Sequence, residues 1–516
     1  MNFTRPSRRT WLQATAAMTF APALLRFARA TEVLRFARAT EVLRFALGIA
    51  SGQPRADRMV LWTRITGADL PPRVEVRWEL ARDEAFTDIA ARGVETAQAE
   101  WAHSVHAEPV GLQPGRRYWY RFSALGQQSA AGRTATAPAP SAAATLKFAI
   151  ASCQRWDAGH FAAWRHIAAE DLDVLIFLGD YIYESASRAD AFRRHEGGVA
   201  STLDQYRARY ATYKSDPLLQ AAHAAAPWLL VWDDHEVDND YAGLQGQHLQ
   251  ADFERRRAAA YQAYWEHMPF PHSARPQGAD MRITGRLDWG TLARIHLLDD
   301  RQYRDPQACP KPGRGGSNTV ALKDCPELQA ARRSLLGTGQ ERWLADGWDS
   351  TRPWNLLAQQ TLMARYSWRD PAQGGGVYWT DGWDGYAASR NRLLGTVAER
   401  KVPGVVVLSG DVHSNYVADL KADFDDDKSP VVATEFCGTS ITSLSLAQER
   451  IDAARGFNPH VVYGRGDQRG YMRFTLDAKQ LQVGLRVLDD VMNVDSGVAT
   501  VARFAVEAAR PGALPA

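Results

Sequence analysis

The amino-acid sequence predicts two domains of different class, an all-β sandwich followed by a layered α/β domain. Residues 46–136 consist of short runs rich in Val, Trp and Tyr that are separated by Pro, Gly and Asp. Residues 137–145 are rich in Pro and Ala, as interdomain linkers are. Beyond them, apolar runs alternate with helical patterns. A chain of 516 residues, 45% hydrophobic and 23% charged, is long enough for two cores.

The first domain is expected to be a fibronectin- or immunoglobulin-like sandwich over residues 46–136. Val74–Leu80 and Tyr118–Phe122 alternate between apolar and polar residues, which is typical of strands with one buried face. Turn-forming residues separate these runs at the short intervals of antiparallel sandwiches.

The second domain, residues 146–516, is expected to contain a largely buried sheet flanked by helices. Apolar runs predict strands at Leu146–Ala151, Val174–Leu178, Trp228–Trp232, Leu292–Leu298, Trp354–Ala358 and Val405–Leu408. Amphipathic patterns predict helices at Ala158–Ala169, Leu203–Tyr213 and Phe253–Glu266.

Residues 1–45 are expected to form a twin-arginine signal peptide with a duplicated cleavage region. Ser7–Gln13 is similar to the twin-arginine (Tat) consensus, and an apolar stretch follows. Small residues at Ala28–Ala30 suit a signal peptidase, but a near copy at Ala37–Ala39 leaves the cleavage point open. Pro22 interrupts an apolar run already too short to cross a bilayer, so no transmembrane segment is expected. The Tat export machinery is therefore an expected partner, and the location is periplasmic or secreted.

The charge balance argues against a nucleic-acid partner. Residues 1–30 contain five arginines and no acid, so the net charge of +2 for the whole chain becomes −3 without them. Nucleic-acid binding needs a basic face, and no cluster of Lys and Arg supplies one.

Two of the four cysteines are candidates for a disulfide. Cys309 and Cys325 flank a loop rich in Gly, Pro and Lys, and an oxidising exported setting permits a bond between them. The sequence leaves this pairing open, because the distance between the two residues cannot be judged from it.

Polar side chains directly follow four of the predicted strands. They are Cys153, Asp180 and Tyr183, Asp234, and Asp411 with His413. Ligand sites gather at the carboxyl ends of strands in layered α/β proteins, so these side chains are expected to converge. Each alone fits a structural role as a turn aspartate, a buried histidine or a buried thiol. Together they are costly to bury without cations, which favours a site for two metal ions.

Five motifs in this order carry a family resemblance. They are Ala151–Gln154, Gly179–Glu184, Trp232–Asn239, Leu298–Arg304 and Gly410–His413. The chain thereby resembles the alkaline phosphatase D (PhoD-type) family of calcineurin-like metallophosphoesterases, and Gly48–Arg64 is similar to the N-terminal domain of that family. The resemblance implies a four-layer metallophosphoesterase fold for residues 146–516, with two β-sheets between layers of helices.

The same resemblance implies a centre containing Fe³⁺ and Ca²⁺. It assigns the iron to Cys153, Asp180, Tyr183 and His413, with Asp180 bridging to calcium and Asp234 and Asp411 on the calcium side. The resemblance places Asp234 where related enzymes carry a metal-binding Asn, and Asp411 where many carry a His. Carboxylate oxygen at both positions favours a hard cation such as calcium.

The resemblance implies that His235 lies over the substrate, and it is the candidate general acid for the leaving oxygen. The resemblance also implies that a metal-bound hydroxide attacks phosphorus. Glu236 is expected to fix the tautomer of His235. Glu184 is expected to be a solvated or supporting carboxylate. Arg301 is a candidate phosphate contact, with a structural ion pair as the alternative.

The sequence thus predicts an exported, metal-dependent alkaline phosphatase or phosphodiesterase that acts on small or polymeric phosphate esters. The choice between monoesters and diesters stays open, because the pocket walls select the leaving group. The alternative is a catalytically silent extracellular binding protein that uses its sandwich domain, and this alternative predicts missing ligand residues.

Overall fold

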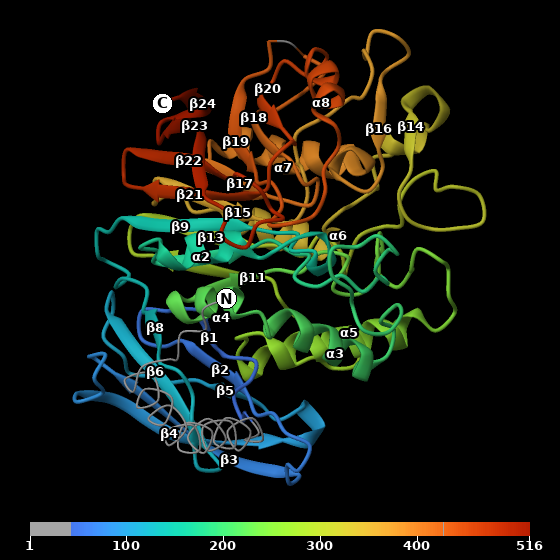
Figure 1. Ribbon diagram of the computed structural model, residues 1–516. Coiled ribbons are helices and arrows are strands. Elements are labelled where there is room, and N and C mark those ends of the chain that lie inside the picture. Colours follow the sequence, from blue (N-terminus) through green and yellow to red (C-terminus); the bar gives the residue numbers. More distant parts are fainter. Residues whose placement is uncertain (1–42, 427) are drawn as a thin grey trace, which may run out of the picture.

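The structure is a computed structural model that describes residues 43–426 and 428–516. The twin-arginine motif and both candidate cleavage sites lie outside the described residues. Two β-sheets form the middle of the molecule, with helices beyond them and the N-terminal strands at one end (Figure 1).

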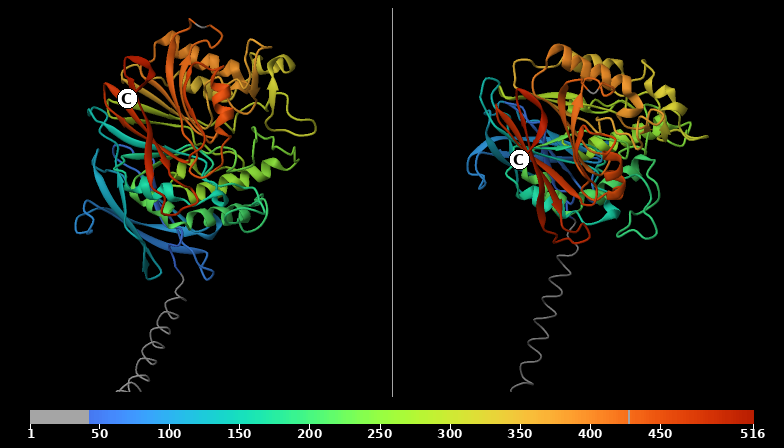
Figure 2. Two further views of the ribbon diagram at one scale, coloured as in Figure 1. Left: turned by 45° about the horizontal axis from the view of Figure 1, so that its top comes forward. Right: turned by 90° about the horizontal axis from the view of Figure 1, so that it is seen from above.

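The larger sheet has ten strands in the order β24-β23-β22-β21-β9-β10-β11-β1-β2-β5. Its parallel centre is β9 (Leu146–Ala151), β10 (Val174–Phe177) and β11 (Trp228–Leu230). The antiparallel strands β21 (Gly470–Leu476), β22 (Gln480–Leu488), β23 (Val498–Glu507) and β24 (Arg510–Pro515) extend one edge. The other edge is β1 (Ile49–Gly52), β2 (Val60–Arg64) and β5 (Ser104–Ala107). The left view of Figure 2 shows the red C-terminal strands and the blue N-terminal strands at different ends of the sheet.

The second sheet has seven strands in the order β12-β13-β15-β17-β19-β18-β20. Its parallel centre is β13 (Ala293–Leu297), β15 (Trp354–Ala358), β17 (Val405–Ser409) and β19 (Val431–Cys437). The remaining strands are β12 (Gly285–Trp289), β18 (Asn415–Lys421) and β20 (Val461–Arg465). Every residue of β15 and β17 is buried, as expected for a sheet covered on both faces.

Aromatic side chains join the two sheets. Phe474 of β21 stacks on Phe148 of β9, with ring centroids 4.5 Å apart. The same ring meets the edge of Phe436, on β19 of the other sheet, at 5.7 Å. All three side chains are fully buried, so this contact excludes water between the sheets.

Helices cover the outer faces of both sheets. The larger sheet carries α2 (Ala162–Ala169), α3 (Leu203–Lys214), α4 (Pro217–Ala225) and α5 (Phe253–His267). The second carries α6 (Gly337–Ala345), α7 (Ala387–Arg400) and α8 (Gln448–Arg455). Local sequence fixes two of the helix starts: Thr202 and Gln205 form a capping box at α3, and Asp216 caps α4 ahead of Pro217. None of the helices in the described ranges is long and apolar enough to cross a bilayer.

The N-terminal strands are divided between two sheets. A five-stranded sheet contains β3 (Arg73–Ala81), β4 (Ile89–Gln98), β6 (Arg117–Ala124), β7 (Gln127–Gln128) and β8 (Gly132–Ala135). Alternate residues of β3 are buried and exposed, and its inner face packs on residues of β1 and β2. Strand β1, however, pairs with β11 at Gly52 and Trp228, so it continues the larger sheet. A Cβ on Gly52 would lie 2.8 Å from the Pro269 carbonyl oxygen, which shows how closely this junction packs.

Three of the N-terminal strands, β1, β2 and β5, therefore belong to a sheet of the following domain. An independent immunoglobulin-like sandwich ending at residue 136, with a linker over 137–145, stays a prediction.

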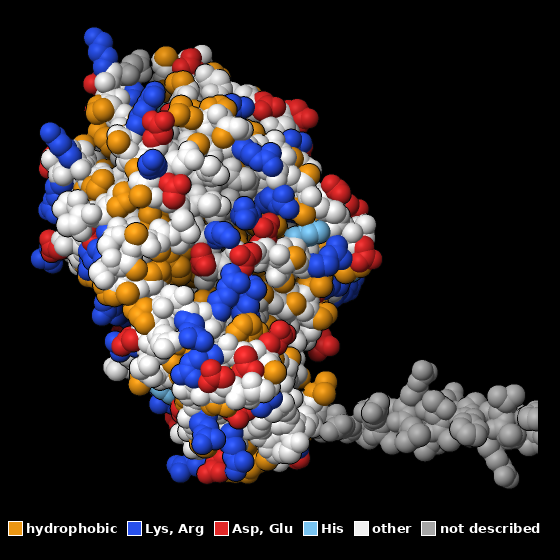
Figure 3. All heavy atoms as spheres, turned by 90° about the vertical axis from the view of Figure 1, so that its left-hand side faces the viewer, with side chains coloured by type: hydrophobic (Ala, Val, Ile, Leu, Met, Phe, Trp, Pro, Cys, Tyr) orange, Lys and Arg blue, Asp and Glu red, His pale blue; other side chains and the backbone are white. Residues whose placement is uncertain are grey.

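On the face drawn in Figure 3, Lys and Arg side chains are intermixed with Asp and Glu, which is the pattern of an ordinary solvated surface.

The disulfide that the sequence left open is present. Cys309 and Cys325 are bonded, with their Cα atoms 6.2 Å apart. The bond closes a loop that contains β14 (Thr319–Ala321), which pairs with β16 (Val377–Trp379).

Replacing both cysteines with serine should lower the free energy of unfolding by about 3 kcal/mol, because the unfolded chain regains the entropy of a loop of about 15 residues. Urea unfolding of the wild type and the double variant measures this difference. Reductant should weaken the wild type and leave the variant unchanged. Equal stability of the two proteins without reductant would contradict the prediction.

Candidate metal centre

The structure brings the six sequence-predicted metal ligands to the carboxyl ends of strands from both sheets. Cys153 follows β9, Asp180 and Tyr183 follow β10, Asp234 follows β11, and Asp411 and His413 follow β17. Ligand atoms of Cys153, Asp180 and His413 all lie within 4.8 Å of one another, as do those of Asp180, Asp234 and His235. Asp180 thus belongs to both groups. Asp411 lines a cavity together with Asp180, Asp234 and His413.

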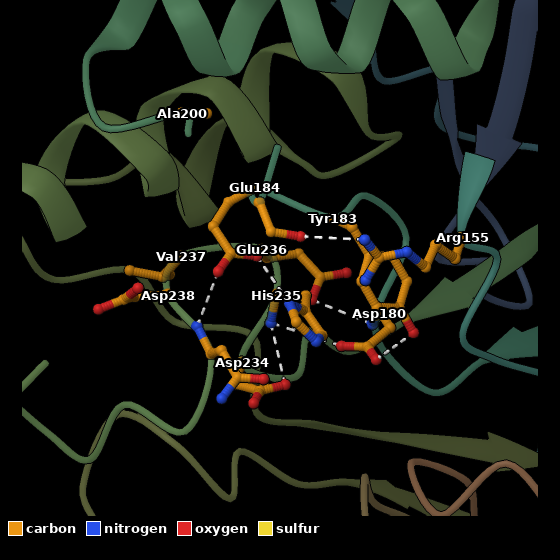
Figure 4. Close-up of polar contacts among 12 residues, drawn as sticks. Arg155, Asp180, Tyr183, Glu184, Ala200, Asp234, His235, Glu236, Val237 and Asp238 are labelled. Atoms are coloured by element: carbon orange, nitrogen blue, oxygen red, sulfur yellow. Dashed lines mark hydrogen bonds and ion pairs between the residues drawn. The ribbon is translucent and has the colours of Figure 1, made fainter. Parts of the chain in front are cut away.

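Tyr183 completes the first of these groups. Its hydroxyl donates to Asp180 Oδ2 at 2.8 Å and lies 3.3 Å from His413 Nε2. Ser443 Oγ lies 2.7 Å from the Tyr183 hydroxyl and 2.9 Å from the Cys153 carbonyl oxygen, so one serine holds both residues in place. Figure 4 shows Asp180, Tyr183, Asp234 and His235 gathered at one point.

Four of these side chains start from a left-handed backbone. The φ angles are 57° at Cys153, 59° at Asp180, 65° at Asp411 and 57° at His413. This region costs a residue with a Cβ roughly 1–3 kcal/mol, and such residues cluster at functional sites. The surrounding loops therefore hold these residues where the isolated chain would not.

Two glycines permit the loops to approach so closely. Gly179 has φ +108°, and a Cβ there would lie 2.5 Å from Asp233 Cβ, so only glycine fits between the loops after β10 and β11. A Cβ on Gly410 would lie 2.4 Å from Ser152 Oγ, which brings the loop of Asp411 against that of Cys153. The second contact crosses from one sheet to the other.

The imidazole of His413 is prepared to act as a ligand. Its Nδ1 lies 2.7 Å from the Leu444 carbonyl oxygen and donates a proton there, which leaves the Nε2 lone pair directed toward Tyr183. Burial lowers the pKa of His413 to about 4, so the ring is neutral at ordinary pH.

The carboxylates and the thiol are poorly compensated by the protein itself. Burial, and next to it the charge of Asp233, raises the pKa of Asp411 well above its usual range. Burial raises the pKa of Asp180 in the same way, and burial together with Asp180 raises that of the Cys153 thiol. Asp411 Oδ2 is buried without a hydrogen-bond partner among the described residues. This donor set of carboxylate, imidazole, phenol and thiol fits two cations, which would supply the missing positive charge.

The partner of His235 differs from the one that the sequence suggested. His235 Nδ1 lies 2.6 Å from Glu184 Oε2, and Glu184 Oε1 accepts the Asn239 backbone N–H at 3.1 Å. Glu236 instead accepts the backbone N–H groups of Asp180, Tyr181 and Asp233, so it shapes the loops rather than the histidine. The expectation for Glu236 was therefore wrong.

Glu184 and His235 shift each other's pKa in opposite directions. Burial alone would raise the pKa of Glu184, but the neighbouring His235 and other groups lower it to about 2. Burial would likewise lower the pKa of His235, yet Glu184 and Asp180 together raise it well above its usual value. Glu184 thereby favours the protonated form of His235 and engages its Nδ1 side.

Arg301 does not line the cavity over the candidate ligands, although the sequence made it a candidate phosphate contact. Its guanidinium is fully buried and forms ion pairs with Asp233 at 2.5 Å and Asp381 at 2.8 Å. Arg304 pairs with the same Asp381 at 2.8 Å. The structural ion pair, which was the alternative for Arg301, is what the structure contains.

A cavity of about 480 Å³ opens over the ligand cluster and is lined by Asp180, Asp234, His235, Asp411 and His413. Two further acids went unrecognised in the sequence: ligand atoms of Asp240, Asp381 and Asp234 lie within 4.8 Å of one another. A polar residue directly after a strand was the available signal for Asp381, which follows β16.

The family assignment follows from comparison with known proteins. The PhoD-like phosphatase family matches residues 148–485, and the N-terminal domain of PhoD-like phosphatases matches residues 29–138. The chain belongs to the PhoD-like phosphatase family. The family resemblance that the five motifs indicated is therefore confirmed.

Two members of the family resemble this PhoD-like phosphatase over most of its length. Alkaline phosphatase D of Bacillus subtilis is 41% identical over 485 residues, which cover 90% of this chain and 81% of the relative. A solved structure of PhoD has 40% identity and a TM-score of 0.87, with 92% of each chain covered. The protein is accordingly a metal-dependent phosphoesterase.

A more distant structure shares the fold alone. A purple acid phosphatase from seeds of yellow lupin (Lupinus luteus) has a TM-score of 0.55 at 11% identity, covering 89% of this chain and 74% of that one. The two proteins thus share their overall fold over most of this chain.

Glu184→Gln should reduce kcat roughly 10–100-fold, the usual effect of removing the hydrogen-bond partner behind a functional side chain. The amide keeps the size of the carboxylate but removes the negative charge that holds His235 protonated. Steady-state kinetics and metal analysis measure the effect. The exposed Glu196→Gln is the matched control, and activity of Glu184→Gln equal to that of the control would refute the role of Glu184.

Proposed function

We propose that this PhoD-like phosphatase hydrolyses phosphate esters at a centre containing Fe³⁺ and Ca²⁺. In this proposal the iron ligands are Cys153, Asp180, Tyr183 and His413, and calcium shares Asp180 and takes Asp234 and Asp411. The observation that carries it is the position of Asp180, whose carboxylate belongs to two ligand groups at once. A ligand shared by two cations would hold them close enough to clamp the attacking and leaving oxygens of phosphoryl transfer.

The chemistry of the donors supports the choice of ions. A thiol, a phenol and an imidazole surround one side of Asp180 and suit a transition metal such as iron. Carboxylates surround the other side and suit a hard cation such as calcium. When bound, the two ions neutralise phosphate charge and activate water as the nucleophile.

In this proposal the protein handles the proton through His235. Glu184 engages Nδ1, so Nε2 is the atom that meets the substrate and donates a proton to the leaving oxygen. The His235 ring packs against Tyr183 with centroids 4.1 Å apart, which restricts its rotation. Arg301 acts indirectly, because it fixes Asp233 and Asp381 behind the ligands.

The proposal includes export through the Tat pathway to the periplasm or the outside of the cell. The motif in Ser7–Gln13 and the Cys309–Cys325 disulfide support it, since disulfides persist in oxidising compartments. A catalytically silent binding protein is disfavoured, because a competent side chain fills every candidate ligand position.

Hydrolysis of p-nitrophenyl phosphate and of bis(p-nitrophenyl) phosphate, with calcium added and then chelated, tests the activity and decides between monoesters and diesters. Elemental analysis of the same preparation tests the ions. Iron and calcium in near-equal amounts, with activity lost on chelation, is the expected result. Zinc as the sole metal would overturn the assignment of the ions.

Asp180→Asn should abolish binding of both ions and turnover, since one carboxylate serves both ligand groups. Metal content and initial rates measure the effect. The exposed Asp190→Asn is the control for the same chemical change. Near-normal metal content in Asp180→Asn would contradict the bridging role.

His235→Ala should leave iron bound but slow hydrolysis roughly 10²–10⁴-fold, the contribution of a general acid. An ester with a leaving group that needs no proton should be less affected than an alkyl ester. His248→Ala, at an exposed position, is the control. Unchanged rates would remove His235 from the mechanism.

A further inference from the structure

The cavity over the candidate metal ligands has a second half made of apolar side chains. The apolar side chains that line the same cavity as the candidate ligands are Leu362, Tyr366, Trp368, Trp379, Leu444 and Leu446. One cavity therefore joins a site for phosphate chemistry to an apolar wall. A substrate that enters has to satisfy both halves.

The aromatic part of this wall is held rigidly. The Tyr366 ring meets Trp368 edge-on at 5.0 Å and contacts Tyr416 at 5.1 Å. The Tyr366 hydroxyl donates to the Ile451 carbonyl oxygen at 3.2 Å, so its polar atom is engaged outside the cavity. The rings are thus fixed before a ligand arrives, which limits the entropy lost on binding.

The two tryptophans are linked through the backbone. The Trp368 N–H donates to the Val377 carbonyl oxygen at 2.9 Å, and Val377 begins the strand β16 that ends with Trp379. Both tryptophans are half-buried, so part of each indole faces solvent in the cavity.

The two leucines lie on the loop that supports the candidate iron ligands. Ser443 and the Leu444 carbonyl group hold Tyr183 and His413, yet the side chains of Leu444 and Leu446 are 71% and 40% exposed. Large exposed apolar side chains beside a reaction site mark a place where an apolar ligand binds.

The apolar wall carries few charged groups. Arg450 is the one Lys or Arg among the described residues that line the cavity, and its guanidinium lies 4.7 Å from the Trp368 ring centroid. Asp384 is paired with Arg390 at 2.6 Å, and the rest of the wall consists of aromatic rings and leucines, which cannot compensate the charge of a polyanionic leaving group. An uncharged apolar group fits this wall better.

We propose that the apolar wall binds the leaving alcohol, so the preferred substrates are phosphate esters of apolar alcohols, with Trp368, Trp379 and Leu444 as specificity-determining residues. This inference rests on the proposed phosphoesterase activity of the same cavity. The contacts remove apolar surface of the alcohol from water, and they lie beside the metal ligands, where a leaving group has to be.

A series of n-alkyl phosphates from methyl to hexyl tests the inference, because the leaving alcohols differ in apolar surface and little in reactivity. The holoenzyme should show kcat/KM rising at least about 10-fold along the series, mainly through KM, a factor that apolar pockets reach with a single methylene. A phosphate ester whose alcohol has the length of hexyl but contains an ether oxygen should lose most of this gain in kcat/KM. A flat series, or an ether as good as hexyl, would overturn the proposal.

Trp368→Ala should flatten the chain-length dependence. Trp348→Ala removes another half-buried tryptophan that does not line this cavity and should keep the dependence. An undiminished dependence in Trp368→Ala would overturn the role of Trp368. Metal-dependent hydrolysis with equal rates along the series would refute the apolar preference alone, whereas no hydrolysis of any ester would refute the phosphoesterase activity itself.

Discussion

Buried negative charge at the meeting point of two sheets is the constraint on which the rest of this structure depends. Asp180, Asp234 and Asp411 follow strands of both sheets and line one cavity, with Asp180 and Asp234 buried and Asp411 partly buried. The protein places Arg301 beside Asp233 and Asp381, but Asp411 Oδ2 has no partner among the described residues. Such a cluster is costly without cations, so folding and metal binding are expected to be linked.

The two-sheet architecture makes this cluster geometrically feasible. Each sheet directs the carboxyl ends of its parallel strands to one edge, and the contact between Phe474 and Phe436 sets the sheets close enough for the loops to touch. Gly410 then lies against the loop of Cys153, and Ser443 fastens that loop to Tyr183. The left-handed backbone at four candidate ligands is the conformational cost of bringing these side chains to one point.

The sequence could predict the elements that depend on local patterns. Leu146–Ala151 and Trp354–Ala358 are strands at the predicted bounds, because continuous apolar runs define strands buried on both faces. Helix α2 starts at Ala162 rather than Ala158, since Trp156–Ala158 forms a 3₁₀ turn ahead of it. The ligands were foreseeable as polar residues directly after apolar strands.

Long-range partners were not foreseeable. Glu184 lies 51 residues from His235, and Arg301 lies 80 residues from Asp381, so no spacing rule links them. Nothing in the short strand β1 signals that it joins β11.

The central claim, one metal centre built from both sheets, is tested most directly by X-ray absorption at the edge of the bound transition metal. A sulfur ligand that disappears in Cys153→Ser is the predicted result, and a metal signal without sulfur, unchanged by that substitution, would contradict the account.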